Sequence, residues 1–176
     1  MFKTDNTKAT VTVVQGGVLD WTVDAIVNAA NSSLLGGGGV DGAIHRAAGP
    51  KLVMECMKLH GCRAGEAKIT GAYNIKTAKY IIHTVGPYYR NRPNDPETLA
   101  SCYRNSLDLA LANNCQSIAF PCISTGVYSY PIEDAAEIVL KTVGEWLDAH
   151  PESDIKIMFC CFKPNEYEVY EQLYNS

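Results

Sequence analysis

Residues 28–49 contain the side chains with the clearest chemical potential, a run of four glycines bracketed by two polar residues. Glycines allow positive φ angles and let the backbone approach a ligand without a Cβ in the way. An apolar helix pattern begins at Asp41, so the glycines lead into a helix N-terminus, where free amides and the helix dipole attract anions. Asn31 and Asp41 lie on either side of the loop. We interpret the segment as a diphosphate site with reactive side chains beside it.

Simpler interpretations of the same residues remain open. Four glycines can form a flexible loop, and Asp41 can act only as a helix N-cap. Asn31 can occupy a turn, because asparagine tolerates the left-handed conformation. The dinucleotide fingerprint and the phosphate-binding loop motif do not fit, since no Lys followed by Ser or Thr comes after the glycines. The phosphate interpretation therefore rests on the helix N-terminus.

Three segments in this order resemble one known family. Asn31 and, after six intervening residues, Gly-Gly-Val-Asp at residues 38–41 are similar to the first ligand loop of macrodomains. The likeness is to the MacroD-type branch, which includes bacterial O-acetyl-ADP-ribose deacetylases. Residues 82–87 (Ile-His-Thr-Val-Gly-Pro) and 124–131 (Ser-Thr-Gly-Val-Tyr-Ser-Tyr-Pro) also resemble the family. The resemblance covers essentially the whole chain, so we expect residues 1–176 to form a single macrodomain.

The resemblance implies a hydrolase that binds ADP-ribose and needs no metal or other cofactor. Its reactions would be the removal of mono-ADP-ribose from acidic side chains of proteins and the deacetylation of O-acetyl-ADP-ribose. Its partners would be ADP-ribose, O-acetyl-ADP-ribose and mono-ADP-ribosylated proteins. Two other functions stay open: a non-catalytic reader of ADP-ribose, and a regulatory protein that acts through contacts with another macromolecule.

The resemblance also implies roles for individual residues. Asn31 would bind the distal ribose, and backbone amides of the two loops would hold the diphosphate. Asp41 would position a water molecule, because a carboxylate at a helix N-terminus is stabilised as an anion and is a weak base. Phe162 would form a platform for adenine, with core packing as the alternative. The expected catalytic residues are Asn31 and Asp41, and the expected ADP-ribose-binding residues are Val18, Asn31, Gly38, Gly39, Val40, Asp41, Ser124, Thr125, Gly126, Val127, Tyr128 and Phe162.

One position departs from the family pattern. The family has Gly-Asp-Ile after its first long strand, and that aspartate accepts a hydrogen bond from the amino group of adenine. This chain has Gly-Gly-Val at residues 16–18. Gly17 cannot accept the bond, and a hydrogen bond to a charged group is worth about 1.5–3 kcal/mol. We therefore expect weaker or less selective adenine binding, which favours the reader unless Asp20 compensates.

Other reactive residue types are assigned structural roles. His45 lies four residues after the loop aspartate on the same helix face and could contact it, but a packed structural histidine is the simpler interpretation. His83 lies in an apolar strand and is assigned to the core. Cys56, His60 and Cys62 resemble part of a metal site, but a fourth ligand with matching spacing is missing. We expect no bound metal.

The composition bounds the class of protein. The chain of 176 residues has no apolar run of the roughly 20 residues that cross a membrane, and its start lacks the apolar core of a signal peptide. Seven cysteines without a framework spacing indicate reduced thiols and a cytoplasmic location. The net charge of −4 argues against a nucleic-acid partner, so backbone amides would have to hold an anionic ligand.

The elements that must position these residues alternate along the chain. Alternation with β-branched residues predicts a strand at residues 10–15, and apolar runs predict strands at residues 24–28, 79–85, 117–121 and 155–162. Helical spacing with start and stop signals predicts helices at residues 41–48, 50–60, 95–113, 131–147 and 165–174. This alternation, with strands buried on both faces, indicates an α/β/α sandwich, and the resemblance adds the central mixed sheet of the macrodomain fold. Ligand loops in such folds lie at strand ends.

Overall fold

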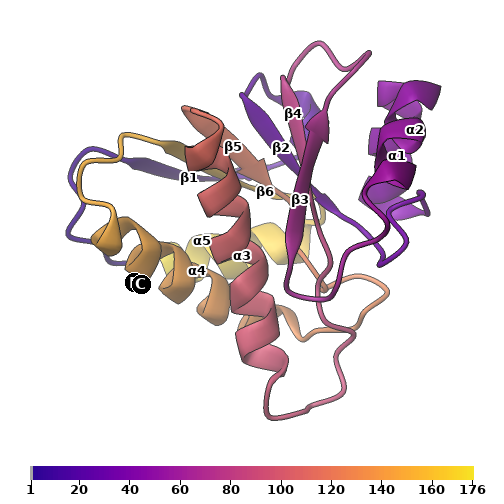
Figure 1. Cartoon of the computed structure of the whole chain (residues 1–176). Coiled ribbons are helices and arrows are strands. Elements are labelled where there is room, and N and C mark those ends of the chain that lie inside the picture. The colour runs from indigo at the N-terminus through magenta and orange to yellow at the C-terminus, as the bar shows by residue number, and fades with distance from the viewer. Residues whose placement is uncertain (1) are drawn as a thin grey trace.

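A six-stranded mixed sheet forms the centre of the molecule in the computed structural model, which describes residues 2–176 (Figure 1). The strands follow the order β1-β6-β5-β2-β4-β3. Within the described chain, β3 runs antiparallel to β4, and every other neighbouring pair is parallel. The strands are β1 (Thr10–Gln15), β2 (Ala25–Ala29), β3 (Ala67–Gly71), β4 (Tyr80–Thr84), β5 (Ser117–Phe120) and β6 (Lys156–Cys161).

Helices cover both faces of this sheet. Each group of helices packs on its own hydrophobic cluster. One cluster lies under the first two α-helices and the short 3-10 helix η1, and the other lies under the last three α-helices. Figure 1 shows α1 and α2 apart from α3, α4 and α5, with strands between the two groups. The helices are η1 (Val18–Asp20), α1 (Gly39–Ala48), α2 (Pro50–Lys58), α3 (Asp95–Ala112), α4 (Ile132–Ala149) and α5 (Pro164–Asn175).

The predicted α/β/α sandwich is confirmed, and the predicted elements match the structure to within a few residues. Strand β3 and helix η1 were not predicted. β3 contains Lys68, Thr70 and Gly71 and lies at an edge of the sheet with most of its residues half-buried, so it lacks the apolar run by which strands were recognised. An edge strand with one solvated side carries a weaker hydrophobic signal than a central strand.

Helix α1 begins two residues earlier than predicted, and this changes the position of Asp41. Gly38 is the N-cap, so Asp41 is the third residue of the helix, and no side chain caps the helix. The alternative that Asp41 serves as the N-cap is therefore wrong. Gly39 begins the helix at φ 58, a left-handed conformation that glycine adopts without strain.

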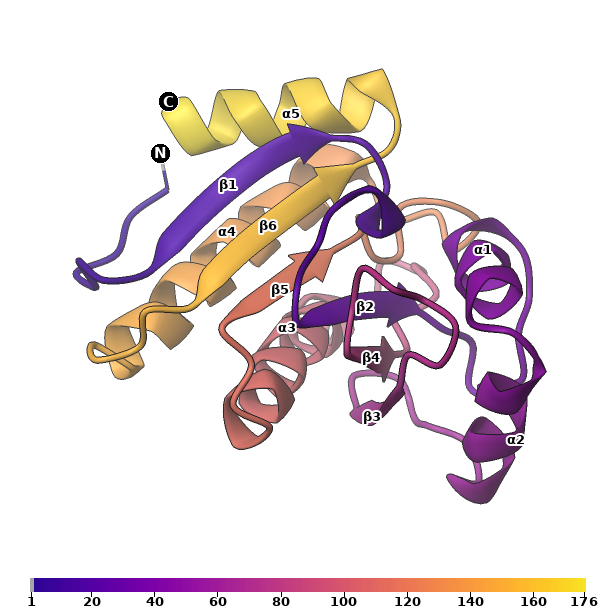
Figure 2. The ribbon, with the colours of Figure 1, turned by 90° about the horizontal axis from the view of Figure 1, so that it is seen from above.

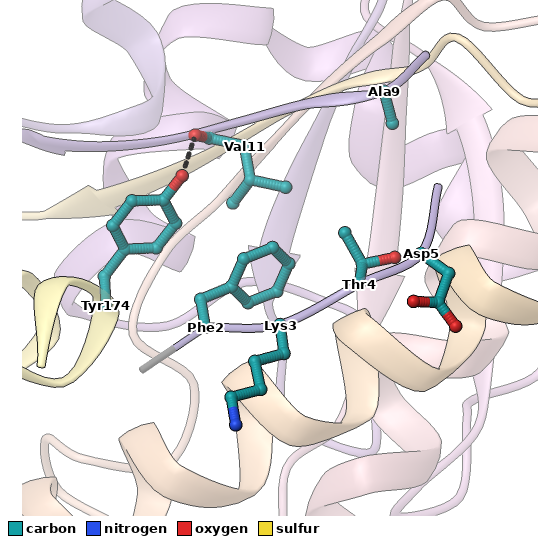
Figure 3. Close-up of a pocket in the computed structure, with 7 residues that line it drawn as sticks. All are labelled: Phe2, Lys3, Thr4, Asp5, Ala9, Val11 and Tyr174. Carbon is teal, nitrogen blue, oxygen red and sulfur yellow. Dashed lines mark hydrogen bonds between the residues drawn. The ribbon is translucent and has the colours of Figure 1, made fainter. Parts of the chain in front are cut away.

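The two ends of the described chain lie side by side. Figure 2 shows the start of the described chain next to the end of α5. The amide of Phe2 donates a hydrogen bond to the carbonyl of Tyr174, and the two rings stack. Between the N-terminal segment, β1 and Tyr174 is a hollow of about 470 Å³ (Figure 3). None of the residues expected to bind ADP-ribose lines it.

All seven cysteines have free thiols. Between residues 2 and 176, none of the helices has the length and apolar character that a membrane crossing requires.

Candidate active site

The two expected ligand loops leave neighbouring parallel strands at their carboxyl ends. β2 leads through residues 30–38 into α1 on one face of the sheet, and β5 leads through residues 121–131 into α4 on the other face. Where consecutive connections diverge to opposite faces, an α/β sheet opens a crevice that commonly binds ligands. The topology therefore brings the two predicted loops to one place.

The first loop offers a set of unused backbone donors. The amides of residues 36–41 donate no hydrogen bond to any other residue in the described chain. A Cβ added to Gly38 or Gly39 would meet no atom within 4 Å, so the space above these two glycines is open. Free amides at a helix N-terminus facing open space can accept an anion.

Asn31 and Asp41 converge on one point beside this loop. A Cβ added to Gly37 would lie 3.2 Å from Oδ2 of Asp41 and 3.4 Å from Nδ2 of Asn31. Any other residue at position 37 would occupy the space that the two polar groups share. Gly37 thus keeps that space open, whereas Gly38 and Gly39 give access to the amides of the loop.

Asp41 uses one of its two carboxylate oxygens within the protein. The residue is buried, and Oδ1 accepts a hydrogen bond of 2.8 Å from Nδ2 of Asn28. Nε2 of His45 lies 3.4 Å from the same oxygen without making a hydrogen bond to it, so the two side chains approach each other as the alternative to a purely packed histidine had it. Oδ2 accepts no hydrogen bond from residues 2–176 and faces the space beside Gly37. It is therefore available to a water molecule or a ligand.

Asn31 is more fully engaged than expected. Its Nδ2 donates to the carbonyl of Gly36 (2.9 Å), and its Oδ1 accepts from Oγ of Ser33 (2.7 Å) and from the amide of Leu34 (3.2 Å). An amide oxygen has two lone pairs and an amide nitrogen two hydrogens. Asn31 therefore keeps one N–H for a ligand, whereas its oxygen is already occupied.

The second loop turns its first two side chains inward and leaves its amides free. Oγ of Ser124 donates to the carbonyl of Pro87, and Oγ1 of Thr125 donates to Oε2 of the buried Glu166 at 2.8 Å. The amides of residues 124–128 donate no hydrogen bond within the described part of the chain. Ser124 and Thr125 can thus serve a ligand through their backbone, as the expectation for this loop requires.

Exposed apolar side chains surround the same edge of the sheet. Val127 is 87% exposed and Phe162 76% exposed, and they follow the neighbouring strands β5 and β6. Leu35 and Tyr88 are also exposed, after β2 and β4. The alternative that Phe162 packs in the core is therefore wrong. A planar ligand lying over Phe162 would cover part of this apolar surface.

The residues after β1 differ from the expectation in two ways. Val18 is buried in the core under η1, so it can reach a ligand only through its backbone. Gly17 has an extended backbone with φ −97, and its amide donates to Oδ2 of Asp20 at 2.8 Å. The chain thus places a carboxylate at this turn, three residues after the position at which the family has one.

His83 is buried, as predicted, and it belongs to a polar network. Its Nδ1 lies 3.1 Å from Nδ2 of Asn28, and its Nε2 lies 2.9 Å from Oγ1 of Thr70. Burial, with a smaller contribution from the nearby His45, lowers the pKa of His83 to about 3. The imidazole is therefore neutral at ordinary pH.

Cys56, His60 and Cys62 do not gather as metal ligands would. Sγ of Cys56 lies 4.0 Å from Nε2 of His83, whereas Sγ of Cys62 donates to the carbonyl of Arg63. Burial raises the pKa of the Cys56 thiol to about 11, which keeps it protonated. Across residues 2–176, no group of three or more His, Cys, Asp or Glu side chains is arranged to hold a metal ion.

Sequence reasoning missed two residues that support the loops. Asn28 holds Asp41 from the end of β2, and Glu166 holds Thr125 from the first turn of α5. A signal for Asn28 existed, because an asparagine in a run of Ala, Ile and Val must find buried partners. Glu166 gave no such signal, because its partner Thr125 lies 41 residues away and no spacing of neighbouring residues points to the pair.

Comparisons with known proteins identify relatives over most of the chain. Residues 27–139 match the family described as Macro domain. The chain is 55% identical over 160 residues to Macro domain-containing protein CT2219 of Chlorobaculum tepidum, covering 90% of this chain and 92% of that protein. It is 52% identical over 167 residues to ADP-ribose glycohydrolase MACROD2 of Homo sapiens, covering 94% of this chain and 39% of that longer protein.

Solved structures resemble the whole fold. The Oceanobacillus iheyensis macrodomain with ADP superposes with a TM-score of 0.90 at 41% identity, covering 96% of this chain and 91% of that chain. The Trypanosoma brucei macrodomain in complex with ADP-ribose superposes with a TM-score of 0.86 at 47% identity, covering 93% of this chain and 68% of that chain. The resemblance of the three sequence segments is thereby confirmed at the level of the family and the fold.

Proposed function

The chain belongs to the macrodomain family and is a homologue of the MacroD-type ADP-ribose glycohydrolases, and on this premise we propose that it is a hydrolase of the same kind. Its substrates would be proteins carrying mono-ADP-ribose on acidic side chains, and O-acetyl-ADP-ribose. The observation that carries the proposal is the convergence of Asp41 Oδ2 and Asn31 Nδ2 beside Gly37, next to a loop of free amides.

In this proposal the ligand is held mainly by the backbone. The amides of residues 36–41 and 124–128 bind the diphosphate from two sides, which suits a chain with a net charge of −4 and no Lys or Arg in either loop. Adenine lies over the exposed ring of Phe162. The distal ribose lies beside Gly37, where Asn31 donates its remaining N–H to a ribose oxygen.

Hydrolysis then depends on a water molecule next to Asp41. Oδ2 accepts a hydrogen bond from that water and orients it towards the anomeric carbon or the ester carbonyl of the ribose. When the water attacks the anomeric carbon, its oxygen bonds to that carbon, the bond from the carbon to the ester oxygen breaks, the protein carboxylate leaves, and the proton released by the water goes to a phosphate oxygen of the ligand. When the water attacks the ester carbonyl of O-acetyl-ADP-ribose, its oxygen bonds to the carbonyl carbon and the bond from that carbon to the ribose oxygen breaks. Acetate is then the product, and the proton released by the water passes by way of the phosphate to the departing ribose oxygen.

The first prediction tests these two side chains. Asp41→Ala should lower the release of ADP-ribose from a mono-ADP-ribosylated protein by about a hundredfold or more, which is the usual loss when a reactant is no longer held in position. Asn31→Ala should also lower turnover. Calorimetry with ADP-ribose should show binding to Asp41→Ala within about tenfold of wild type, because the amides of both loops remain.

Asp134 provides a matched control. It is the third residue of α4, as Asp41 is of α1, but its side chain is exposed. Asp134→Ala should retain wild-type turnover. If Asp41→Ala and Asn31→Ala both hydrolyse at the wild-type rate, neither residue takes part in the reaction.

A reader of ADP-ribose is the second candidate function, and the turn at Gly17 favours it. Gly17 has no side chain with which to select adenine. A wild-type protein that binds ADP-ribose but releases none from modified proteins and deacetylates no O-acetyl-ADP-ribose would support the reader.

A further inference from the structure

A line of buried polar side chains runs from Asp41 into the sheet, and the proposed function uses only its first member. Asn28 on β2 and His83 on β4 are register partners on neighbouring strands, and Thr70 lies on β3 beyond them. Asn28 and His83 are fully buried and Thr70 is 2% exposed. Burying such groups is costly unless each finds hydrogen-bond partners, so an apolar residue would suit these positions better if they served packing alone.

The chemistry of the groups fixes the direction of every bond. Nδ2 of Asn28 can only donate, and it reaches both Oδ1 of Asp41 and Nδ1 of His83. Nδ1 of His83 must therefore accept, which places the ring proton on Nε2. That N–H donates to Oγ1 of Thr70, whose own hydroxyl donates to the carbonyl of Gly71 at 3.1 Å.

The oxygen of Asn28 provides an independent observation. Oδ1 of Asn28 is buried and has no hydrogen-bond partner among the described residues. The orientation of this side-chain amide is therefore set by the two hydrogen bonds of its nitrogen, because its oxygen makes none. Turning the amide by 180° would place Oδ1 against the carboxylate of Asp41 and against the lone pair of His83.

We propose that His83, backed by Thr70, is a positioning residue that locks the Asn28 amide and thereby holds the Asp41 carboxylate with Oδ2 towards the loop. His83 touches neither the expected ligand nor the reacting atoms, and it acts through Asn28. A neutral imidazole is required, because a proton on Nδ1 would meet the N–H of Asn28. The low pKa of His83 keeps that form over the pH range of an enzyme assay.

This inference rests on the proposed function, so its test begins with wild-type turnover. His83→Leu removes the acceptor, and His83→Asn can place an amide oxygen where Nδ1 was. His83→Leu should lower kcat by about tenfold, as expected when a charged hydrogen bond loses its geometry, with the affinity for ADP-ribose within about threefold of wild type. His83→Asn should restore most of the lost kcat.

Thr70 and Thr142 form a matched pair for the far end of the network. Both hydroxyls are buried and donate to backbone carbonyls, but Thr142 lies on α4 and bonds to Ile138. Thr70→Val and Thr142→Val should lose similar stability in thermal unfolding. Only Thr70→Val should lower kcat, by about two- to fivefold, because the loss is transmitted through His83.

Two results would overturn the proposal. One is a folded His83→Leu protein with wild-type kcat, and the other is a His83→Asn protein as impaired as His83→Leu. If His83→Leu does not fold, the kcat values of His83→Asn, Thr70→Val and Thr142→Val test the proposal. A Thr70→Val protein with the same kcat as Thr142→Val would then overturn it.

If the wild type releases no ADP-ribose, the proposed function fails and a second measurement tests the network. NMR hydrogen exchange should show slow exchange of the Asn28 side-chain amide protons in wild type and in His83→Asn, and faster exchange in His83→Leu or Thr70→Val. Equal protection in all of these proteins would show that His83 does not hold Asn28.

Discussion

Asp41 and Asn31 lie at opposite ends of the glycine loop and differ in how the protein uses them. Asp41 keeps one carboxylate oxygen free, whereas the side-chain amide of Asn31 already makes hydrogen bonds to Ser33, Leu34 and Gly36. Asn31 therefore shapes the loop as well as facing the space beside Gly37. Its alternative role in a turn and its proposed role at the ribose are compatible.

The second prediction concerns adenine selectivity, at the turn after β1. Gly17 is extended, and a Cβ added to it would lie 3.7 Å from Oδ2 of Asp20, so Gly17→Asp introduces no backbone strain and no clash. The new carboxylate should tighten ADP-ribose binding by up to about 1.5–3 kcal/mol, the value of a charged hydrogen bond. Calorimetry with ADP-ribose and with its inosine analogue, which lacks the amino donor, measures the effect.

Asp20 supplies the opposing outcome of that experiment. Its carboxylate already lies at the amide of Gly17. If Asp20→Ala removes the preference for adenine over inosine while Gly17→Asp leaves it unchanged, Asp20 is the acceptor and the glycine is no functional loss.

The sequence motifs were sufficient to predict which two loops meet at one edge of the sheet. The motifs at residues 31–41 and 124–131 identified the two loops, and the structure brings both to the same edge of the sheet. The orientation of each side chain could not be predicted. Whether Asn31 offers its nitrogen or its oxygen to a ligand depends on the exact fold of the loop. Whether His83 only fills the core or joins a hydrogen-bond network depends on a partner 55 residues away.

At the scale of elements, the second loop depends on the first turn of α5. Oε2 of Glu166 accepts from Thr125, and Oε1 accepts from the amide of Lys163, so one buried carboxylate joins the loop to the helix. This contact fixes the backbone whose amides are proposed to bind the diphosphate. The loop is therefore positioned by a helix that follows it by more than thirty residues.

The third prediction tests this connection. Glu166→Ala leaves a hydroxyl and an amide without their acceptor and should lower the free energy of unfolding by about 1–3 kcal/mol. It should also weaken ADP-ribose binding, because the loop loses its anchor. Glu168 lies on the same helix with its side chain exposed, and Glu168→Ala should change stability by less than about 0.5 kcal/mol. Chemical denaturation and calorimetry of both variants measure these effects, and equal results would contradict the role of Glu166.

The elements themselves were predicted best where they are most buried. β2, β5 and β6 have almost continuous apolar sequences, and α4 carries a clear apolar stripe. β3 was missed because its position is fixed by pairing with β4, not by its own hydrophobicity. The start of α1 was misplaced because glycines at its first positions carry no helix signal.

At the scale of the whole molecule, His83 should make stability depend on pH. The folded protein keeps His83 neutral down to about pH 3, whereas the unfolded chain protonates it near the ordinary pKa of 6.5. Between these values the unfolded state binds more protons, so the free energy of unfolding should fall as the pH drops below 6.5. The slope should approach about 1.4 kcal/mol per pH unit.

Two histidine variants isolate this fourth prediction in urea denaturation between pH 7 and pH 4.5. His83→Asn removes the titrating group and should flatten the slope. His60 is exposed and has a left-handed φ of 57, which asparagine tolerates, so His60→Asn should keep the wild-type slope. The lowered pKa of Asp95 acts only at lower pH, because a carboxylate stays ionised above its ordinary range. An unchanged slope in His83→Asn would assign the pH dependence to other groups.

The pairing of β1 with β6 has a consequence for how the chain is made. β1 is an edge strand whose sheet partner is β6, the last strand in residues 2–176. During translation β1 has no strand to pair with until residues 156–161 have left the ribosome, whereas β2, β3 and β4 can pair earlier. Contacts between distant segments form late and expose unpaired edges meanwhile. A nascent chain arrested before β6 should therefore be the species most in need of a chaperone, with Thr10–Gln15 as the segment that it must cover.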